Sequence, residues 1–243
     1  MLVLGIDTSS SSASVALLDD GQLLGEVLVN STKTHSQKLL PIIDQLLCNC
    51  DVKVKDLDLI GVATGPGSFT GVRIGLSTAK GLAHPFNIPL VEVSTLEAMG
   101  YNLVFADTLV CPIFDARRDQ VYTRVMAWEQ GLLKTIIADE NCLIDELMDQ
   151  LEALARPVTF IGDGVLKFET RLKERLGERA IMAPQNTRMP RGSSVAQCAF
   201  DKPENARRKY DDVKANYLRK SEAERTYEEN QQAGQGAELS EKE

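Results

Sequence analysis

The chain has 243 residues, of which 43% are hydrophobic and 26% charged, which is ordinary for a globular protein of one large or two small domains. Its formal net charge of −8 argues against a broad basic face for nucleic acid, so any RNA contact should be local or made through a partner. No stretch approaches the roughly 18 unbroken apolar residues of a membrane-spanning helix.

The cysteines and the two ends of the sequence bear on where the protein acts. The cysteine count of five is odd and contains no Cys-x-x-Cys pair, which favours reduced thiols. The first residues lack a basic leader and resemble a strand, so we expect no signal peptide and a cytoplasmic protein. Residues 222–243 are rich in Glu, Gln, Gly and Ser, and we expect a disordered tail there.

The first half of the chain alternates strand-like and helix-like patterns. An Asp20-Gly21 turn joins two of the strands, and Ser94 with Glu97 has the form of a helix-capping box. The apolar spacing predicts strands at 2–9, 13–19, 22–30, 57–64 and 88–93, and helices at 34–47, 72–83 and from 94 onward.

The second half repeats this order of elements without a detectable repeat of residue identity. The expected elements are strands at 109–116, 120–128, 132–139 and 157–161 and a helix at 143–155. We therefore expect an α/β protein with duplicated βββαβα units and a mixed sheet in each lobe: a first lobe at 1–105, a second lobe at 106–221 and the tail at 222–243.

This duplicated order resembles the ASKHA group of folds, which includes actin, Hsp70 and sugar kinases. In that group a nucleotide lies between two lobes, and the first hairpin of each lobe grips its phosphates. Asp7 and Asp115 stand where the acids of those hairpins would lie.

The turn at Gly65-Pro66-Gly67 leads from a strand into a helix, as phosphate-binding loops do. Its spacing to Gly71 is one residue too long for a dinucleotide fingerprint, and no lysine follows as a P-loop requires. Two hypotheses remain open. The helix start holds an anion, or the glycines supply backbone angles that other residues resist.

The helix expected at 72–83 is apolar or small on almost every side. Only Arg73 and Lys80 interrupt this pattern. Such a helix is normally covered on more than one side, so we expect its own sheet to cover one face and a partner molecule to cover another. The alternative is that the helix lies wholly inside its own domain.

Several segments together resemble the TsaB (YeaZ) family of bacterial tRNA threonylcarbamoyladenosine biosynthesis proteins, over about residues 1–225. The segments that carry the resemblance are LGIDTSSSSASVAL, THSQKLLP, GPGSFTGVRIGLSTAKGLA, FDARRDQVY and ANYLRKSEAE. Of these, the GPGSFTG-x-RIG block is the most specific.

The resemblance implies a role and a set of partners. TsaB-like proteins pair with a catalytic paralogue, TsaD, and with the ATPase TsaE, to modify the adenosine beside the anticodon of tRNAs that read codons beginning with A. In the family, first-lobe helices dock against TsaD or a second TsaB copy. The interface residues that we expect here are His35, Leu39, Ile43, Leu46, Arg73, Ile74, Gly75, Thr78 and Gly81.

The resemblance and the residues together argue against catalysis by this chain. TsaD-type sites hold a metal through paired histidines, whereas His35 and His84 here have no second histidine one helical turn away. A proteolytic site would need a metal triad or a Ser-His-Asp set, and only two histidines are present to serve as its base. We therefore expect no metal site and no catalytic residue.

The expected nucleotide cleft also looks degenerate. Active members of the group usually have a glycine two residues after the hairpin acid, but this chain has Ser9 after Asp7 and Arg117 after Asp115. We expect no bound cofactor in this chain and ATP or ADP only at the level of the complex, with tRNA contacted indirectly. The competing hypothesis is a nucleotide-dependent phosphotransferase or hydrolase that acts alone.

Overall fold

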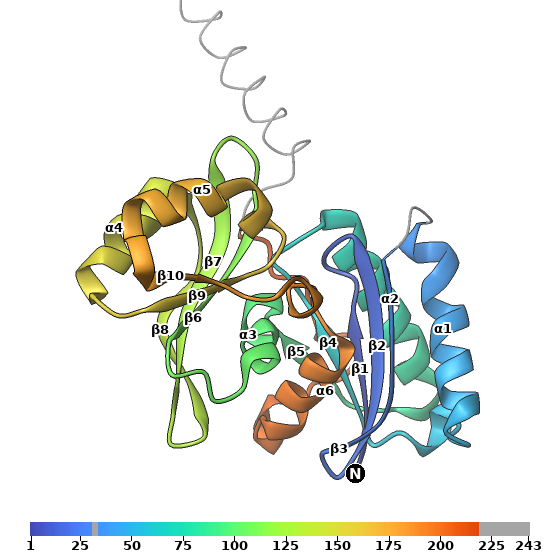
Figure 1. The fold of residues 1–243 in the computed structure, drawn as a ribbon. Helices are drawn as coiled ribbons and strands as arrows, with labels where there is room; N and C mark the ends of the chain where they lie inside the picture. Colours follow the sequence, from blue (N-terminus) through green and yellow to red (C-terminus); the bar gives the residue numbers. More distant parts are fainter. Residues whose placement is uncertain (31–33, 219–243) are drawn as a thin grey trace, which may run out of the picture.

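The computed structural model describes residues 1–30 and 34–218, which form two α/β lobes facing one another (Figure 1). The first lobe contains a five-stranded sheet in the order β3-β2-β1-β4-β5. Its first three strands are antiparallel, and β4 and β5 run parallel to β1. The strands are β1 (Leu2–Asp7), β2 (Ser12–Asp19), β3 (Gln22–Asn30), β4 (Leu59–Ala63) and β5 (Leu90–Val93).

The second lobe repeats this topology, with its sheet in the order β10-β9-β6-β7-β8. The strands β6 to β8 form antiparallel pairs, and β9 and β10 extend the sheet in parallel. The strands are β6 (Leu109–Asp115), β7 (Gln120–Glu129), β8 (Leu132–Leu143), β9 (Val158–Ile161) and β10 (Ala180–Met182). The duplicated α/β fold with two mixed sheets is therefore confirmed.

Two helices cover the outer face of each sheet (Figure 1). In the first lobe these are α1 (His35–Asn49) and α2 (Phe69–Ala83), and in the second lobe α4 (Ile144–Leu154) and α5 (Gly164–Leu176). Their buried aliphatic side chains form one core with each sheet. Single turns of 3₁₀ helix occupy several connections: Val54–Asp56, His84–Phe86, Tyr101–Leu103, Gly177–Arg179, Gln185–Thr187 and Glu204–Ala206.

The two remaining helices are exchanged between the halves of the chain. Helix α3 (Thr95–Gly100) comes from the first half, yet Leu96 and Met99 pack on the second sheet. Helix α6 (Gly192–Asp201) comes from the second half, yet it packs on the first sheet. Both lie between the sheets in Figure 1, where each covers the inner face of one sheet.

This exchange crosses the expected lobe boundaries, which stay a prediction. The chain enters the packing of the second sheet at α3, before the expected boundary at residue 105. It returns to the first lobe at α6, well before residue 221, and Arg208 then forms an antiparallel bridge with Leu90 at the edge of β5. The reason is physical: each sheet has two apolar faces, and its own consecutive helices cover only one of them.

Other expectations can be compared with the described residues. All five cysteines are free thiols, as the odd count indicated. No helix within 1–30 and 34–218 combines the length and apolar character needed to cross a bilayer. The expected tail at 222–243 lies outside the described residues.

Close packing of α6 on the first sheet depends on a glycine in β1. A Cβ atom at Gly5 would overlap the backbone of α6, reaching 2.6 Å from the Ala196 nitrogen. By contrast, Gly81 on the outer side of α2 has no atom within 4 Å of the corresponding position.

We predict that Gly5→Ala lowers the free energy of unfolding by about 2 kcal/mol, because α6 has to move away from the sheet. Gly81→Ala is the matched control, and it should leave stability unchanged or raise it by up to about 1 kcal/mol through helix propensity. Urea unfolding of both variants measures the difference. Equal stability of the two variants would contradict the packing described for α6.

Candidate functional site

A cleft of about 910 Å³ separates the two lobes. The first lobe contributes the β1–β2 turn and the loop before α2, and the second lobe contributes the β6–β7 turn. The segment after α6 closes one end. The lining residues used below are Ser9, Phe69, Arg73, Asp115, Arg117, Arg118, Tyr122, Asp163 and Tyr217. The expected candidates Ser9, Asp115 and Arg117 are thus brought together, and Asp7 lies beneath Ser9.

Asp7, at the end of β1, is buried, and both donors that reach it belong to Ser9. The Ser9 amide and hydroxyl donate hydrogen bonds of 2.8 and 2.7 Å to Asp7 Oδ1, while Oδ2 has no hydrogen-bond partner among the described residues. Burial raises the pKa of Asp7 to about 6, against the lowering effect of the Ser9 hydrogen bonds and of the nearby His35. Ser9 therefore closes the cleft floor over this carboxyl.

The glycine turn packs against that same hairpin. Gly67, with φ of 154°, touches the Ser9 backbone, and the Ser68 amide donates a 2.6 Å hydrogen bond to the Ser9 carbonyl oxygen. At Gly71 a Cβ atom would overlap the Thr8 carbonyl oxygen. Of the two hypotheses for the turn, its geometry supports close backbone packing.

Asp115, at the end of β6, lies in a different environment from Asp7. Its side chain is 38% exposed, and Oδ1 accepts 2.9 Å hydrogen bonds from the Arg117 amide and from Lys167 Nζ. The next turn is unusual, because Arg117, Arg118 and Asp119 have φ angles of 66°, 50° and 57°. Three consecutive left-handed residues other than glycine are strained, by about 1 kcal/mol or more each.

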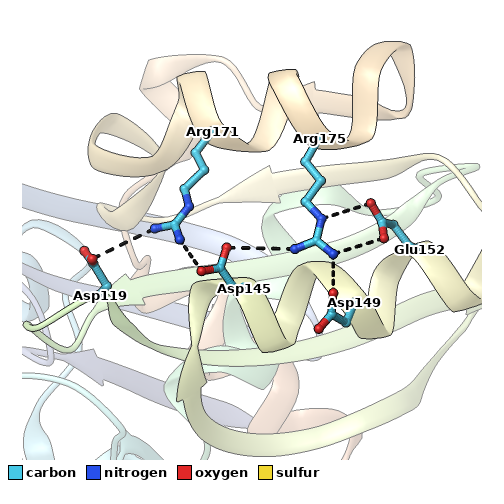
Figure 2. A network of polar contacts seen from close by, with 6 residues as sticks. All are labelled: Asp119, Asp145, Asp149, Glu152, Arg171 and Arg175. Carbon is cyan, nitrogen blue, oxygen red and sulfur yellow. Dashed lines mark hydrogen bonds and ion pairs between the residues drawn. The ribbon is translucent and has the colours of Figure 1, made fainter.

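An ion-pair network between α4 and α5 also includes Asp119 of this turn (Figure 2). Arg171 of α5 reaches Asp119 in the turn at 3.9 Å and also pairs with Asp145 of α4. Arg175 extends the network to α4 by further ion pairs with Asp145, Asp149 and Glu152. These groups are partly exposed, so the network contributes little stability pair by pair, but it restrains the position of the turn.

Sequence reasoning missed a second polar cavity of about 540 Å³ between the lobes. There Arg124 of β7 lies 3.6 Å from Glu97 of α3 and 3.4 Å from Asp139 of β8. Lys202, just after α6, pairs with the same Glu97 at 3.1 Å. Burial raises the pKa of Asp139, an effect that Ser94 and Arg124 oppose.

This cluster ties both exchanged helices to the second sheet. A signal for it was present in the sequence, because Arg124 interrupts the side of β7 that carries Met126 and Trp128. A charged residue on an otherwise apolar strand face needs a partner, but the sequence does not say which acid supplies it.

A groove of about 430 Å³ runs between α1 and α2 on the outer side of the first lobe. Its lining combines the apolar Leu40 and Ile74 with the small polar Ser77 and Thr78. Leu40 is 54% exposed. The expected residues Leu39, Arg73, Ile74 and Thr78 line this groove, and Gly81 lies exposed further along α2. Helix α2 is therefore not enclosed by its own lobe.

Four of the expected interface residues are buried within the first lobe. Leu39, Ile43 and Leu46 of α1 are each at most 3% exposed, since they pack in the core of the first lobe. Gly75 faces inward, where a Cβ atom would overlap the Thr8 hydroxyl. Amphipathic spacing identified the apolar face of α1 correctly, but that face is turned toward the protein's own sheet.

Both histidines have local contacts. His35 Nε2 lies 2.8 Å from the Ser10 carbonyl oxygen, which ties the start of α1 to the β1–β2 turn. His84 packs edge-on against Tyr210 with ring centroids 4.7 Å apart.

Arg73 belongs to both the groove and the cleft. Its guanidinium lies 3.8 Å above the Phe69 ring, and its Nε donates a 2.7 Å hydrogen bond to the Tyr217 hydroxyl. The segment that carries Tyr217 is anchored nearby, because the Asn216 amide donates to the Thr64 carbonyl oxygen at 2.8 Å. Residues after α6 thus form part of the cleft wall and contact Arg73, which lines both the cleft and the groove.

Two duplicated lobes that enclose a cleft between their first hairpins define a protein of the actin-like (ASKHA) class. Among solved structures, a Pseudomonas aeruginosa protein with similarity to peptidase YeaZ matches with a TM-score of 0.76 at 27% identity, covering 90% of this chain and 99% of that chain. A structure described as YeaZ from Pseudomonas aeruginosa matches with a TM-score of 0.72 at 25% identity, covering 89% of this chain and 99% of that one.

Sequence comparison gives the family. A family model described as TsaD, tRNA N6-adenosine threonylcarbamoyltransferase, matches residues 22–227. The tRNA threonylcarbamoyladenosine biosynthesis protein TsaB of Bacillus subtilis is 36% identical, with 95% of this chain and all of that protein covered. The Haemophilus influenzae TsaB is 33% identical, over 63% of this chain and 68% of that protein. The chain belongs to the TsaB (YeaZ) family.

The buried Asp7 predicts a pH dependence of stability. The pKa of Asp7 is about 6 in the folded protein, compared with 3.8 for an aspartate that water reaches freely. Between about pH 4 and pH 6 the folded state therefore keeps a proton on Asp7 that the unfolded state has lost. The contribution of this protonated carboxyl to the free energy of unfolding is present below pH 4 and is lost as the pH rises through 6.

Asp7→Asn removes this titration. We predict that the unfolding free energy of the variant, relative to the unchanged chain, rises by on the order of 2 kcal/mol between pH 4 and pH 7. Urea unfolding across that range measures it. A constant difference between the two proteins would show that Asp7 does not titrate as described.

Proposed function

We propose that this chain is a non-catalytic subunit in the biosynthesis of threonylcarbamoyladenosine next to the anticodon of tRNAs that read codons beginning with A. Its task would be to bind and support a TsaD-type catalytic paralogue through the α1–α2 groove. The names of the relatives support a role in threonylcarbamoyladenosine biosynthesis. The open groove on α2 is the observation that carries the assignment of a docking surface.

The groove has features of a surface for another helix. Leu40 and Ile74 offer apolar area, and the short side chains of Ser77 and Thr78 leave space above the backbone of α2. Gly81 is exposed and has free space around its Cα, so no contact within the chain requires a glycine there. Small residues on a helix face allow a second helix to approach closely.

The match to the TsaD family model supports a paralogue as the partner. Two chains that share a fold present equivalent first-lobe helices, and such faces can pack in a pseudo-symmetric pair. A second copy of this chain could occupy the same surface when the paralogue is absent. In this proposal a TsaE-type ATPase joins the assembly, and ATP or ADP binds at that level.

The cleft supports a non-catalytic role. The position two residues after Asp7 carries Ser9, whose side chain folds back onto Asp7 and fills the space where a phosphate would approach the backbone. The acid itself is buried beneath it. In the second lobe Asp115 is already paired with Lys167. Neither hairpin acid is therefore presented openly to a nucleotide.

The alternative is an enzyme of the same fold that uses a nucleotide alone. Calorimetry of the isolated chain with ATP and magnesium, together with an assay for phosphate release, separates the two functions. Tight binding with turnover would favour the enzyme, and absence of both would favour the supporting subunit.

We predict that Thr78→Glu weakens pairing with the TsaD-type paralogue at least tenfold, because it places a charge in the lining of the groove. Thr170→Glu, on the exposed side of α5, is the matched control and should pair normally. Gly75 is unsuitable for this test because it is packed against Thr8.

Analytical ultracentrifugation or calorimetry with the purified paralogue measures the pairing, and circular dichroism confirms that both variants fold. Undiminished pairing of the Thr78 variant would remove the groove from the interface.

A further inference from the structure

We propose that Arg73 determines which partner occupies the α1–α2 groove, because its guanidinium binds a carboxylate on the docked helix of the paralogue and opposes a second copy of this chain. This inference rests on the proposed function and adds the chemistry that the docked surface must carry. It predicts an aspartate or glutamate on the partner, at the place where the docked helix crosses Arg73.

The Arg73 side chain is held by neutral groups. Its guanidinium stacks 3.8 Å above the Phe69 ring, and its Nε donates a 2.7 Å hydrogen bond to the Tyr217 hydroxyl. The residue is exposed, and its Nη1 and Nη2 atoms form no hydrogen bond or ion pair with residues 1–30 or 34–218. These contacts restrict the side chain but leave its charge unpaired, so less conformational entropy is lost when a carboxylate binds.

The acids of the neighbouring cleft do not neutralise Arg73. Arg73 also lines that cleft, together with Asp115 and Asp163. Asp115 is paired with Lys167 at 2.9 Å, and Asp163 accepts a hydrogen bond from the Asp115 amide. Neither acid lines the groove, where Arg73 is the one charged residue among the described residues of the lining. The groove therefore offers a cation without an acid of its own.

The two helices that form the groove are cationic, although the whole chain has a net charge of −8. Their charged side chains are Lys38, Arg73 and Lys80 against the single acid Asp44. Lys38 is buried, which leaves Arg73 and Lys80 as the accessible cations. A positive docking face attracts an acidic surface and repels another positive one. An arginine binds a carboxylate through two parallel hydrogen bonds, which adds a geometric requirement to this attraction.

A second copy of this chain meets that requirement poorly. A twofold pair brings the same patch of both subunits together, so each groove would face another groove whose lining contains an arginine and no acid. Asp44, on the exposed side of α1, lies outside that lining. Self-pairing therefore brings like charges together or leaves Arg73 unpaired, whereas a paralogue with a carboxylate at this place pairs with it.

The test measures pairing with the paralogue and self-pairing for the same variants, by calorimetry and analytical ultracentrifugation over a series of salt concentrations. Arg73→Gln should weaken pairing with the paralogue about tenfold and reduce its salt dependence, while self-pairing stays unchanged or becomes stronger. Arg73→Lys keeps the charge but loses the planar fork, so it should also pair more weakly with the paralogue. Arg156→Gln removes a charge from an exposed position after α4 and should alter neither equilibrium.

The carboxylate on the partner is identified by replacing the aspartates and glutamates of the paralogue's first-lobe helices by their amides, one at a time. One of these variants should weaken pairing as much as Arg73→Gln does. Combining that variant with Arg73→Gln should cause no further loss, because the two changes remove the same ion pair.

Tyr217 is tested as the residue that positions Arg73. Tyr217→Phe removes the hydroxyl that accepts from Nε, and it should weaken pairing with the paralogue by roughly threefold. In combination with Arg73→Gln it should add nothing, since the hydroxyl acts through the guanidinium. A further loss in the double variant would show that Tyr217 does not act through Arg73.

Three results would overturn the inference: full pairing of Arg73→Gln with the paralogue, equal losses of pairing and of self-pairing, or the lack of any paralogue acid whose removal is coupled to Arg73. Equal losses would mean that Arg73 binds Asp44 of a second copy or supports the fold of α2, and circular dichroism of the variant distinguishes these two. The proposed function fails independently, if the unchanged chain does not pair with the paralogue at all.

Discussion

The structure depends on one constraint, which is that each of its two sheets has two apolar faces to cover. Helices α1 and α2 cover one face of the first sheet, and α4 and α5 cover one face of the second. The inner faces are covered by the exchanged helices, α6 on the first sheet and α3 on the second. Because burial of apolar area is the main favourable term in folding, this exchange joins the lobes into one molecule.

The exchange also determines where polar groups can lie. Arg124, Glu97, Asp139 and Lys202 meet between the lobes, where α3 and the end of α6 approach the second sheet. Such partly buried charges stabilise one another, since each would be costly to remove from water alone. These ion pairs hold α3 and the end of α6 against the second sheet, and they therefore restrain the two lobes that form the neighbouring cleft.

The two hairpins that face one another across the cleft have diverged in chemistry. In the first lobe, Ser9 covers a buried Asp7, and the glycine turn packs against the hairpin. In the second lobe, Asp115 is partly exposed and paired with Lys167, and its turn carries two arginines. Arg73 and Tyr217 connect this cleft to the groove on α2. A partner in the groove and a ligand in the cleft would therefore contact the same side chains.

The sequence by itself determined the order of the elements, the duplicated α/β fold and the family resemblance, because apolar periodicity and turn residues are local properties. It also indicated Asp7, Ser9, Asp115 and Arg117 as residues of one cleft. Only the tertiary structure decided which apolar residues of α1 and α2 face inward, since periodicity marks an apolar stripe without naming what covers it. Ile43, Leu46 and Gly75 belong to the core for that reason, while the buried Leu39 lines the open groove together with Ile74 and Thr78. The Arg124 cluster and the helix exchange likewise join residues far apart in the chain, and packing between the lobes alone places them together.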